Sequence, residues 1–270
     1  MDKASFGGVA VAVVGILLGL TLEGGKVAQI MQPTAAMIVF GGTLGAVMLQ
    51  FPMGIVLAAF RRLGSVFIDS AKNPREKITE IVQYAQKARK EGIVSLDSEV
   101  ERVQDPFLKK SLMLAVDGTE PQELQKMMEL ELDNQAEHED QIPKVFESAG
   151  GFAPTVGIIG AVLGLIQVMQ HLDDITEVGR GIAVAFVATI YGVGAANLFF
   201  LPCAGKIKLR IRQEQIVREM TLEGVISILE GMNPRMIETK LLGFLVDANK
   251  TEQPAKATDR APAGAAEKIA

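Results

Sequence analysis

The sequence predicts an all-α integral membrane protein with four transmembrane helices and a large helical cytoplasmic loop between the second and third. Apolar residues other than glycine make up 49% of the 270 residues, glycine contributes 27 more residues, and charged residues make up only 22%, a mixture more apolar than a water-soluble protein of this length. The apolar residues also cluster in four segments without Asp, Glu, Lys or Arg, each near the roughly 17–25 residues with which a helix crosses a membrane. These segments are Phe6–Leu22, Thr34–Ala58, Phe152–Met169 and Ile182–Cys203.

The first two spans form the predicted domain 1–59. The segment before the first span, Met1-Asp2-Lys3, carries little positive charge, and the residues after it, Leu22-Glu23-Gly24-Gly25, lack a convincing small-x-small cleavage site. We therefore expect a retained helix rather than a signal peptide.

Basic residues predict the orientation of the spans, because Lys and Arg stay on the cytoplasmic side of a membrane. They gather after the second and fourth spans, as Arg61, Arg62, Lys72, Arg75, Lys77, Lys206, Lys208, Arg210 and Arg212. The other two connections are short and carry little positive charge. Both termini and the segment 60–150 are therefore expected in the cytoplasm.

The predicted cytoplasmic domain, 60–150, is patterned as packed helices. Apolar residues recur at helical spacing after an Asn N-cap and a first-turn proline, and further caps follow along the segment. The expected starts and ends are, in order, Asn73-Pro74, Gly92, a Ser95 cap, Asp105-Pro106, Gly118 and Thr119-Glu120-Pro121. No strand pattern occurs in the sequence.

The last two spans form the predicted domain 151–204. Pro154 opens the third span and Pro202 closes the fourth near the same face, so both are candidates for a hinge or pore mouth as well as for ordinary helix punctuation. The segment 205–250 continues as helix with a break near Gly231. The segment 251–270 has almost no large apolar residue and is expected to be disordered.

Small residues recur four apart in every span, a spacing that lets helix backbones approach closely. The sets are Gly15 and Gly19, Gly41 and Gly45, Gly160 and Gly164, and Ala188, Gly192 and Ala196. Packing within one chain explains any single set. Over four spans, however, some of these faces are expected to meet other subunits, so the chain is predicted to form a homo-oligomer.

Composition excludes several functions. A single cysteine, Cys203, and two histidines, His138 and His171, predict no metal site. The sequence has no basic stripe interleaved with aromatic residues, which argues against nucleic acid as a partner, and no phosphate loop or nucleophile motif, which argues against an enzyme and a cofactor.

Ion transport is the remaining active function, with a passive scaffold that only oligomerises as the alternative. Ionisable residues inside a membrane mark ion pathways, and the four spans contain none. If the chain conducts protons, the carboxylate must come from a second polypeptide.

Three long blocks carry a resemblance to a known family. They are LEGGKVAQIMQPTAAMIVFGGTLGA at Leu22–Ala46, GGFAPTVGIIGAVLGLIQVM at Gly150–Met169 and AVAFVATIYGVGAANLFFLP at Ala183–Pro202. In this order they resemble the flagellar motor stator subunits of the MotA type, in the MotA/TolQ/ExbB proton channel superfamily. The resemblance runs from about Gly7 to Asn249. The related ExbB/TolQ class, which energises outer-membrane processes and usually has three spans, is the alternative.

The resemblance implies partners and a location in the inner (plasma) membrane of a bacterial cell. Stators of this type are rings, expected here to be a pentamer, around two copies of a MotB-type partner. The single span of this partner bears the proton-accepting Asp, and its periplasmic domain binds peptidoglycan. Ion flow through the complex produces torque on a rotor switch-complex protein of the FliG type.

The resemblance also implies which residues contact the rotor. In the block ARKEGIVSLD, Arg89 matches the family's basic position and Asp97 its acidic one, although many members have Glu there. From the sequence pattern alone, both would be solvated surface charges near a helix end, which contribute little to stability.

The proton pathway is implied in the same way. Pro154 and Pro202 match two prolines near the channel mouth, and Thr189 matches a pathway Thr of the fourth span. Ala161 stands where sodium-driven members carry a second Thr. Because a sodium ion needs several oxygen ligands, the missing hydroxyl implies that protons drive the complex.

Overall fold

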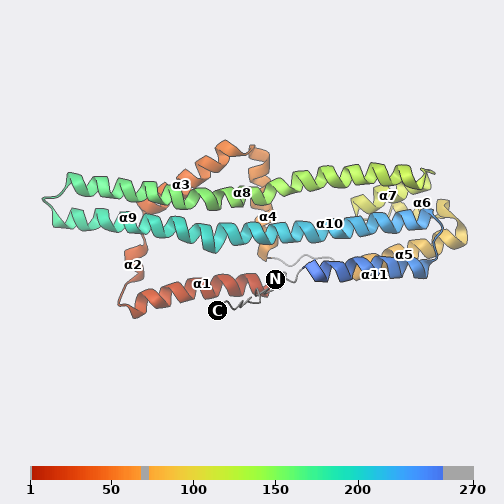
Figure 1. Ribbon diagram of the computed structural model, residues 1–270, viewed down its shortest axis with the longest axis horizontal. Coiled ribbons are helices and arrows are strands. Elements are labelled where there is room, and N and C mark those ends of the chain that lie inside the picture. The colour runs from red at the N-terminus through yellow and green to blue at the C-terminus, as the bar shows by residue number, and fades with distance from the viewer. Residues whose placement is uncertain (1, 68–72, 252–270) are drawn as a thin grey trace, which may run out of the picture. The chain divides into compact units, whose positions relative to one another are not determined.

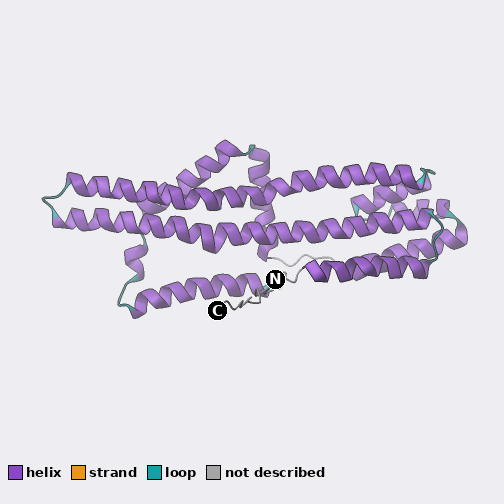
Figure 2. Cartoon of the chain, in the orientation of Figure 1, coloured by secondary structure: helices purple, strands orange, loops and turns teal. Residues whose placement is uncertain are grey.

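The computed structural model describes residues 2–67 and 73–251. Every regular element in these residues is a helix (Figure 2). The chain divides into two compact units, a first unit of residues 1–72 and 126–215 and a second unit of residues 73–125 and 216–270. The predicted disorder of 251–270 lies, from residue 252 onward, outside the described residues.

Four helices of the described chain are long and apolar enough to cross a membrane. They are α1 (Lys3–Leu22), α3 (Pro33–Gln50), α8 (Pro121–Gln170) and a continuous run of α9 (Ile175–Ala195), a π-helical segment (Ala196–Phe200) and α10 (Leu201–Leu229) (Figure 1). The predicted all-α fold with four apolar helices is confirmed at this level. The order in which they cross the bilayer stays a prediction.

The second span is shorter than the predicted Thr34–Ala58. α3 ends at Gln50, and Phe51 adopts an extended backbone conformation, as the residue before a proline usually does. Because Pro52 has no N–H to continue the hydrogen-bond ladder, the chain turns there and the amphipathic helix α4 (Met53–Phe67) begins.

α8 and the α9–α10 run are longer than the spans predicted within them. The predicted cytoplasmic helix from Pro121 and the third span form one helix of 50 residues, with Pro143 and Pro154 inside it. The fourth span likewise continues through Pro202 into α10. Neither Pro154 nor Pro202 therefore ends a helix, so ordinary helix punctuation does not explain them. Where the third and fourth spans begin and end in the bilayer stays a prediction. Each proline removes one backbone donor, yet the helix continues through it.

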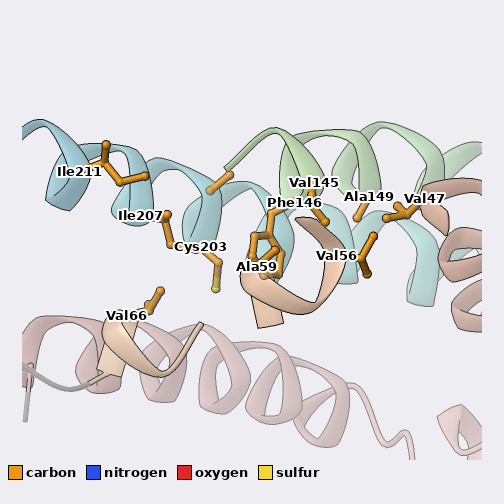
Figure 3. Packing of buried hydrophobic residues seen from close by; sticks show 11 residues of the cluster. Val47, Val56, Ala59, Val66, Val145, Phe146, Ala149, Cys203, Ile207 and Ile211 are labelled. Carbon is orange, nitrogen blue, oxygen red and sulfur yellow. The ribbon is translucent and has the colours of Figure 1, made fainter. Parts of the chain in front are cut away.

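The core of the first unit lies where α4 crosses α8 and α10. Ala59 of α4 and Ile207 of α10 are completely buried there, and the rings of Phe60 and Phe146 meet edge to face at 6.4 Å. Figure 3 shows this cluster, which comprises Val47, Val56, Ala59, Val66, Val145, Phe146, Ala149, Cys203, Ala204, Ile207 and Ile211. α4 therefore packs across the parts of α8 and α10 that adjoin the third and fourth spans.

α1 is held at its N-terminal end. The carboxylate of Asp2 accepts a hydrogen bond from the backbone N–H of Ala4 and pairs with Lys206 of α10 at 2.6 Å, and the Lys206 hydrogen bond holds the pKa of Asp2 below its usual range. The backbone N–H of Asp2 donates to the carbonyl of Phe67, whose ring lies 5.2 Å from that of Phe6. α1 itself buries no residue within the chain.

The second unit confirms most of the predicted helix boundaries. It contains α5 (Pro74–Glu91), the 3-10 helix η1 (Ile93–Leu96), α6 (Asp97–Val100), α7 (Pro106–Val116), α11 (Pro234–Thr251) and the C-terminal part of α10. The short helix α2 (Val27–Ile30) belongs to the first unit. Asn73 and Asp105 cap α5 and α7 as predicted, and Gly92, with φ of 86°, ends α5. Ser95 does not cap a helix, because it lies inside η1 and its hydroxyl donates to the Gly92 carbonyl.

A buried ion-pair cluster joins α5 to α7. The ammonium of Lys77, whose side chain is 9% exposed, lies 2.9 Å from Glu80 and 3.0 Å from Asp105. Burial by itself lowers the pKa of Lys77, but the hydrogen bonds of the two carboxylates outweigh it and raise that pKa. Burial by itself raises the pKa of Asp105. The hydrogen bonds from Lys77 and from two backbone N–H groups outweigh burial, so the pKa of Asp105 lies below its usual value. Burial and Glu80 raise the pKa of Tyr84 to about 12.

The Asp105→Asn variant is expected to lose roughly 2 kcal/mol of unfolding free energy at neutral pH, less than a fully buried pair because Asp105 is partly exposed. Asn keeps the helix cap, so the loss isolates the ion pair. Since the folded pKa of Asp105 is lowered and that of Lys77 raised, the stabilisation is present between about pH 4 and pH 10 and is lost outside this window.

Denaturant unfolding of the full chain in detergent as a function of pH measures this effect. The control is Asp117→Asn, which changes an exposed carboxylate at the end of the same helix α7. Equal stability of the two variants at pH 7 would contradict the assigned role of Asp105.

Candidate functional site

The third and fourth spans meet through their backbones. A Cβ atom added at Gly157 would lie 2.9 Å from the carbonyl oxygen of Ala188, and one at Gly164 would lie 2.8 Å from that of Gly181. A Cβ added at Gly192 would overlap the carbonyl oxygen of Ala153. The small residues predicted to mediate close approach in these two spans therefore do so within the chain. Gly15, Gly19, Gly41 and Gly45 have no such neighbour within 4 Å.

α3 packs along one side of this α8–α9 pair. Gly42 lies against the side chain of Val156, and Val39 is buried with Val187 and Ala188. Where the chain enters α3, the hydroxyl of Tyr191 donates to the carbonyl of Ile30 at 2.6 Å. This side of the pair is closed by the chain's own residues.

The other side of the α8–α9 pair is left open by residues 2–67 and 73–251. On α8, Ala153, Gly157 and Gly164 contact α9, and Gly160 also faces α3. Successive residues of a helix are rotated by about 100°. The side of α8 that faces away from α3 is therefore formed by Pro154, Ile158 and Ala161.

On α9, Ala188 and Gly192 are buried against α8. The residue after each of them, Thr189 and Val193, is rotated by about 100° and lies on the side of α9 away from α3. Val193 is 46% exposed. The surface of Pro154, Ile158, Ala161, Thr189 and Val193 is referred to below as the open flank. It brings together three of the four residues predicted along the proton pathway.

The hydroxyls near the open flank bond to their own helices. Thr189 donates to the carbonyl of Ala185 at 3.2 Å, and the exposed Thr155 donates to that of Phe152 at 2.8 Å. Each oxygen still has lone pairs that can accept a hydrogen bond from water. No group of three or more His, Cys, Asp or Glu side chains gathers as metal ligands anywhere in the described ranges.

Pro202 lies outside the open flank. Leu201, its neighbour in sequence, packs its side chain against Gly150, whereas Ala153, the neighbour of Pro154, lies against Gly192, so the two prolines are offset along the helix pair. Just before Pro202 the helix widens into the π segment, in which the N–H of Leu201 donates to the carbonyl of Ala196. The π segment was not predicted; its one signal in the sequence is Pro202, which cannot donate to the carbonyl four residues earlier.

The residues predicted to contact the rotor lie close together in sequence in the second unit. Arg89 is in the last turn of α5, Asp97 is the first residue of α6, and both are exposed. Neither has an ion-pair partner among residues 2–67 and 73–245, whereas their neighbours Lys87 and Glu99 pair at 2.8 Å. Both charges are thus free to meet another molecule.

The sequence matches two families. Residues 6–92 match the family described as motility protein A N-terminal, and residues 99–220 match the MotA/TolQ/ExbB proton channel family. Motility protein A of Bacillus subtilis (strain 168) is 36% identical over 250 residues, which cover 91% of each chain. The chain belongs to the MotA family. Among other relatives, chemotaxis protein PomA of Vibrio alginolyticus is 32% identical over 93% of this chain and 98% of its own.

Solved MotA-family structures share the fold. The chain matches a structure of C. jejuni MotAB with a TM-score of 0.85 and 32% identity over 90% of this chain and 96% of that one. It matches the flagellar MotAB stator complex of Bacillus subtilis with a TM-score of 0.82 and 36% identity over 93% of this chain and 100% of that one. The resemblance found in the sequence is confirmed, and the chain is a flagellar stator subunit of the MotA type. The ExbB/TolQ alternative is not favoured.

Proposed function

We propose that this MotA-family chain forms the ring of a proton-driven stator in the bacterial inner membrane, with both termini in the cytoplasm. The observation that carries the proposal is the open flank. It is an exposed surface on two apolar helices that pack backbone to backbone, and it bears Thr189 but no ionisable group. Such a surface can contact a partner helix while the partner supplies the carboxylate.

The partner in this proposal is a MotB-type subunit with a single span and a membrane Asp. The open flanks of the ring, expected to be a pentamer, surround the spans of two partner copies and exclude water from the carboxylate. In a dry site the charged form of an Asp is disfavoured, so its pKa rises and it takes up a proton. Thr189 then lines the path by which the proton leaves, and Ala161 leaves no second hydroxyl with which to bind sodium.

The cytoplasmic part transmits the motion to the rotor. We assign this role to the predicted domain 60–150, in which Arg89 and Asp97 meet a rotor switch-complex protein of the FliG type. α8 crosses the boundary at residue 150 without interruption, so a rotation of the third span acts directly on the helix that leads into this domain. Each proton released would advance the ring and press these charges along the rotor.

Proton coupling is tested by rotation of motors that carry this chain and its MotB-type partner as their sole stators. In sodium-free buffer, rotation should continue at full speed and stop when a protonophore collapses the proton gradient. Added sodium should not restore it, because the site lacks oxygen ligands at Ala161. Speed that survives the protonophore and follows the sodium concentration would refute proton coupling.

The Pro154→Ala variant is expected to assemble normally and to turn several-fold more slowly. The substitution restores a backbone donor and stiffens α8 where the open flank must change shape. The control is Pro143→Ala, which restores a donor in the same helix away from the open flank. Single-motor torque is measured for both variants. Equal torque in the two would show that Pro154 has no special role in the shape change of the open flank.

A further inference from the structure

A small apolar pocket opens beside Arg89 in the second unit. Its volume is about 140 Å³, and the end of α5, η1, the end of α10 and the turn that follows α10 enclose it. Its lining includes Ala85, Ala88, Arg89, Ile93, Ile228 and Met232. Arg89, one of the two residues assigned to the rotor, is thus also part of a concave apolar site.

The size of the pocket limits what it can hold. Sites for metabolites and cofactors usually measure about 300–1,000 Å³, and they add several polar groups that orient the ligand. A cavity near 150 Å³ with apolar walls takes a group of the size of benzene. The pocket therefore fits one apolar side chain, and Arg89 is the only charged residue that the described part of the chain places in its lining.

The surroundings have the properties of a protein interface. Val94, next to the lining residue Ile93, is 68% exposed, and Arg89 itself is exposed beside Lys90. An apolar pocket with an arginine at its edge is a common anchor site in protein–protein interfaces. A partner that fits would present an apolar side chain with a carboxylate close to it, because Arg forms short, two-pronged hydrogen bonds with carboxylates.

Residues 252–270 offer no good occupant. The sequence 252–270 contains one large aliphatic residue, Ile269, and no aromatic residue. A lipid bilayer is equally unsuitable, because a concavity for one side chain offers acyl chains no continuous apolar surface.

We propose that this pocket receives an apolar side chain of the rotor switch-complex protein, next to a carboxylate that pairs with Arg89. The inference rests on the proposed function, since it concerns the same rotor contact. It adds an apolar anchor to an interface for which the sequence suggested charges alone. The anchor fixes the register in which the charged residues meet.

Filling the pocket should weaken rotor contact without changing any charge. Ala88→Leu places three additional carbons at the pocket wall, and affinity for the purified rotor switch-complex protein should fall by at least about tenfold, as expected when an interface anchor is lost. The control is Gln86→Leu, which adds an apolar side chain on the exposed face of the same helix. Binding is measured with the complete stator complex in lipid nanodiscs, and motor torque is measured in cells.

A second measurement does not depend on tolerance of the larger side chain. In a chain that carries Cys203→Ser at its buried cysteine, Met232→Cys places a thiol in the pocket. The rate at which a small thiol reagent alkylates this pocket thiol should fall at least about tenfold when the rotor protein is bound, since a covered thiolate is not attacked. Gln83→Cys, exposed on α5 outside the pocket, should not be protected.

The outcomes separate this inference from the proposed function. Protection of the pocket thiol together with weak binding of Ala88→Leu supports the pocket as the anchor. Full binding by Ala88→Leu, or alkylation of the pocket thiol at an unchanged rate in the bound complex, overturns it while leaving the stator function intact. Protection of the pocket thiol without rotor protein would assign the pocket to a second copy of this chain. Absence of rotor binding by the unaltered complex would refute the proposed rotor contact itself.

Discussion

Replacing Gly192 by Ala is expected to separate the third and fourth spans and to stop rotation. The new Cβ would overlap the carbonyl oxygen of Ala153 and lie 3.1 Å from the Cα of Gly157. These are backbone atoms and cannot turn aside as a side chain can, so α8 and α9 must move apart. Overpacking of this kind costs about 1–3 kcal/mol, and the displacement also moves Thr189 relative to Pro154 on the open flank.

The comparison that isolates this effect is Gly194→Ala. Gly194 lies two residues further along α9, and an added Cβ there has no neighbour within 4 Å. Both variants gain the same helix propensity from the substitution. Thermal unfolding of the stator complex and single-motor speed are measured for each. A Gly192→Ala complex as stable and as fast as Gly194→Ala would show that the contact between the two spans tolerates an extra methyl group.

Local signals in the sequence predicted those parts of the fold that local interactions determine. Asn73 before Pro74 and Asp105 before Pro106 start α5 and α7 because a side-chain oxygen satisfies backbone donors that a helix leaves free. Gly92 ends α5 because its positive φ suits a residue without a side chain. Apolar segments predicted the four long helices, since hydropathy over some twenty residues is a strong signal.

Tertiary contacts decided the parts that the sequence did not predict. Proline usually marks a helix end, but Pro154 lies beside Ala153, which is completely buried against α9, and α8 continues through it. Pro52, by contrast, interrupts its predicted helix, and α4 turns to bury Ala59 in the core. Whether a proline ends a helix therefore depends on what packs against the following turn.

The candidate site was predicted as residues but not as a surface. The resemblance to the MotA family implied Pro154, Ala161 and Thr189, and only the contact between α8 and α9 shows that they share the open flank. The pocket beside Arg89 had no signal, because its lining comes from Ala88, Ile228 and Met232, which are far apart in the sequence.

Reversing the charge of Arg89 or Asp97 is expected to reduce torque at least about tenfold while leaving the stator folded and in the membrane, because complementary charge steers and aligns the contact with the rotor. Neither side chain pairs within the described residues, so the main cost to the fold is the loss of a favourable base near the end of α5, about 0.3–1 kcal/mol. Arg75→Glu serves as the control because it reverses an exposed charge in the first turn of the same helix.

Single-motor torque and membrane abundance are measured for both single reversals, the double reversal and the control. Normal torque in all three reversals would locate the rotor contact elsewhere on the chain, whereas reduced abundance would mean that the charges serve assembly.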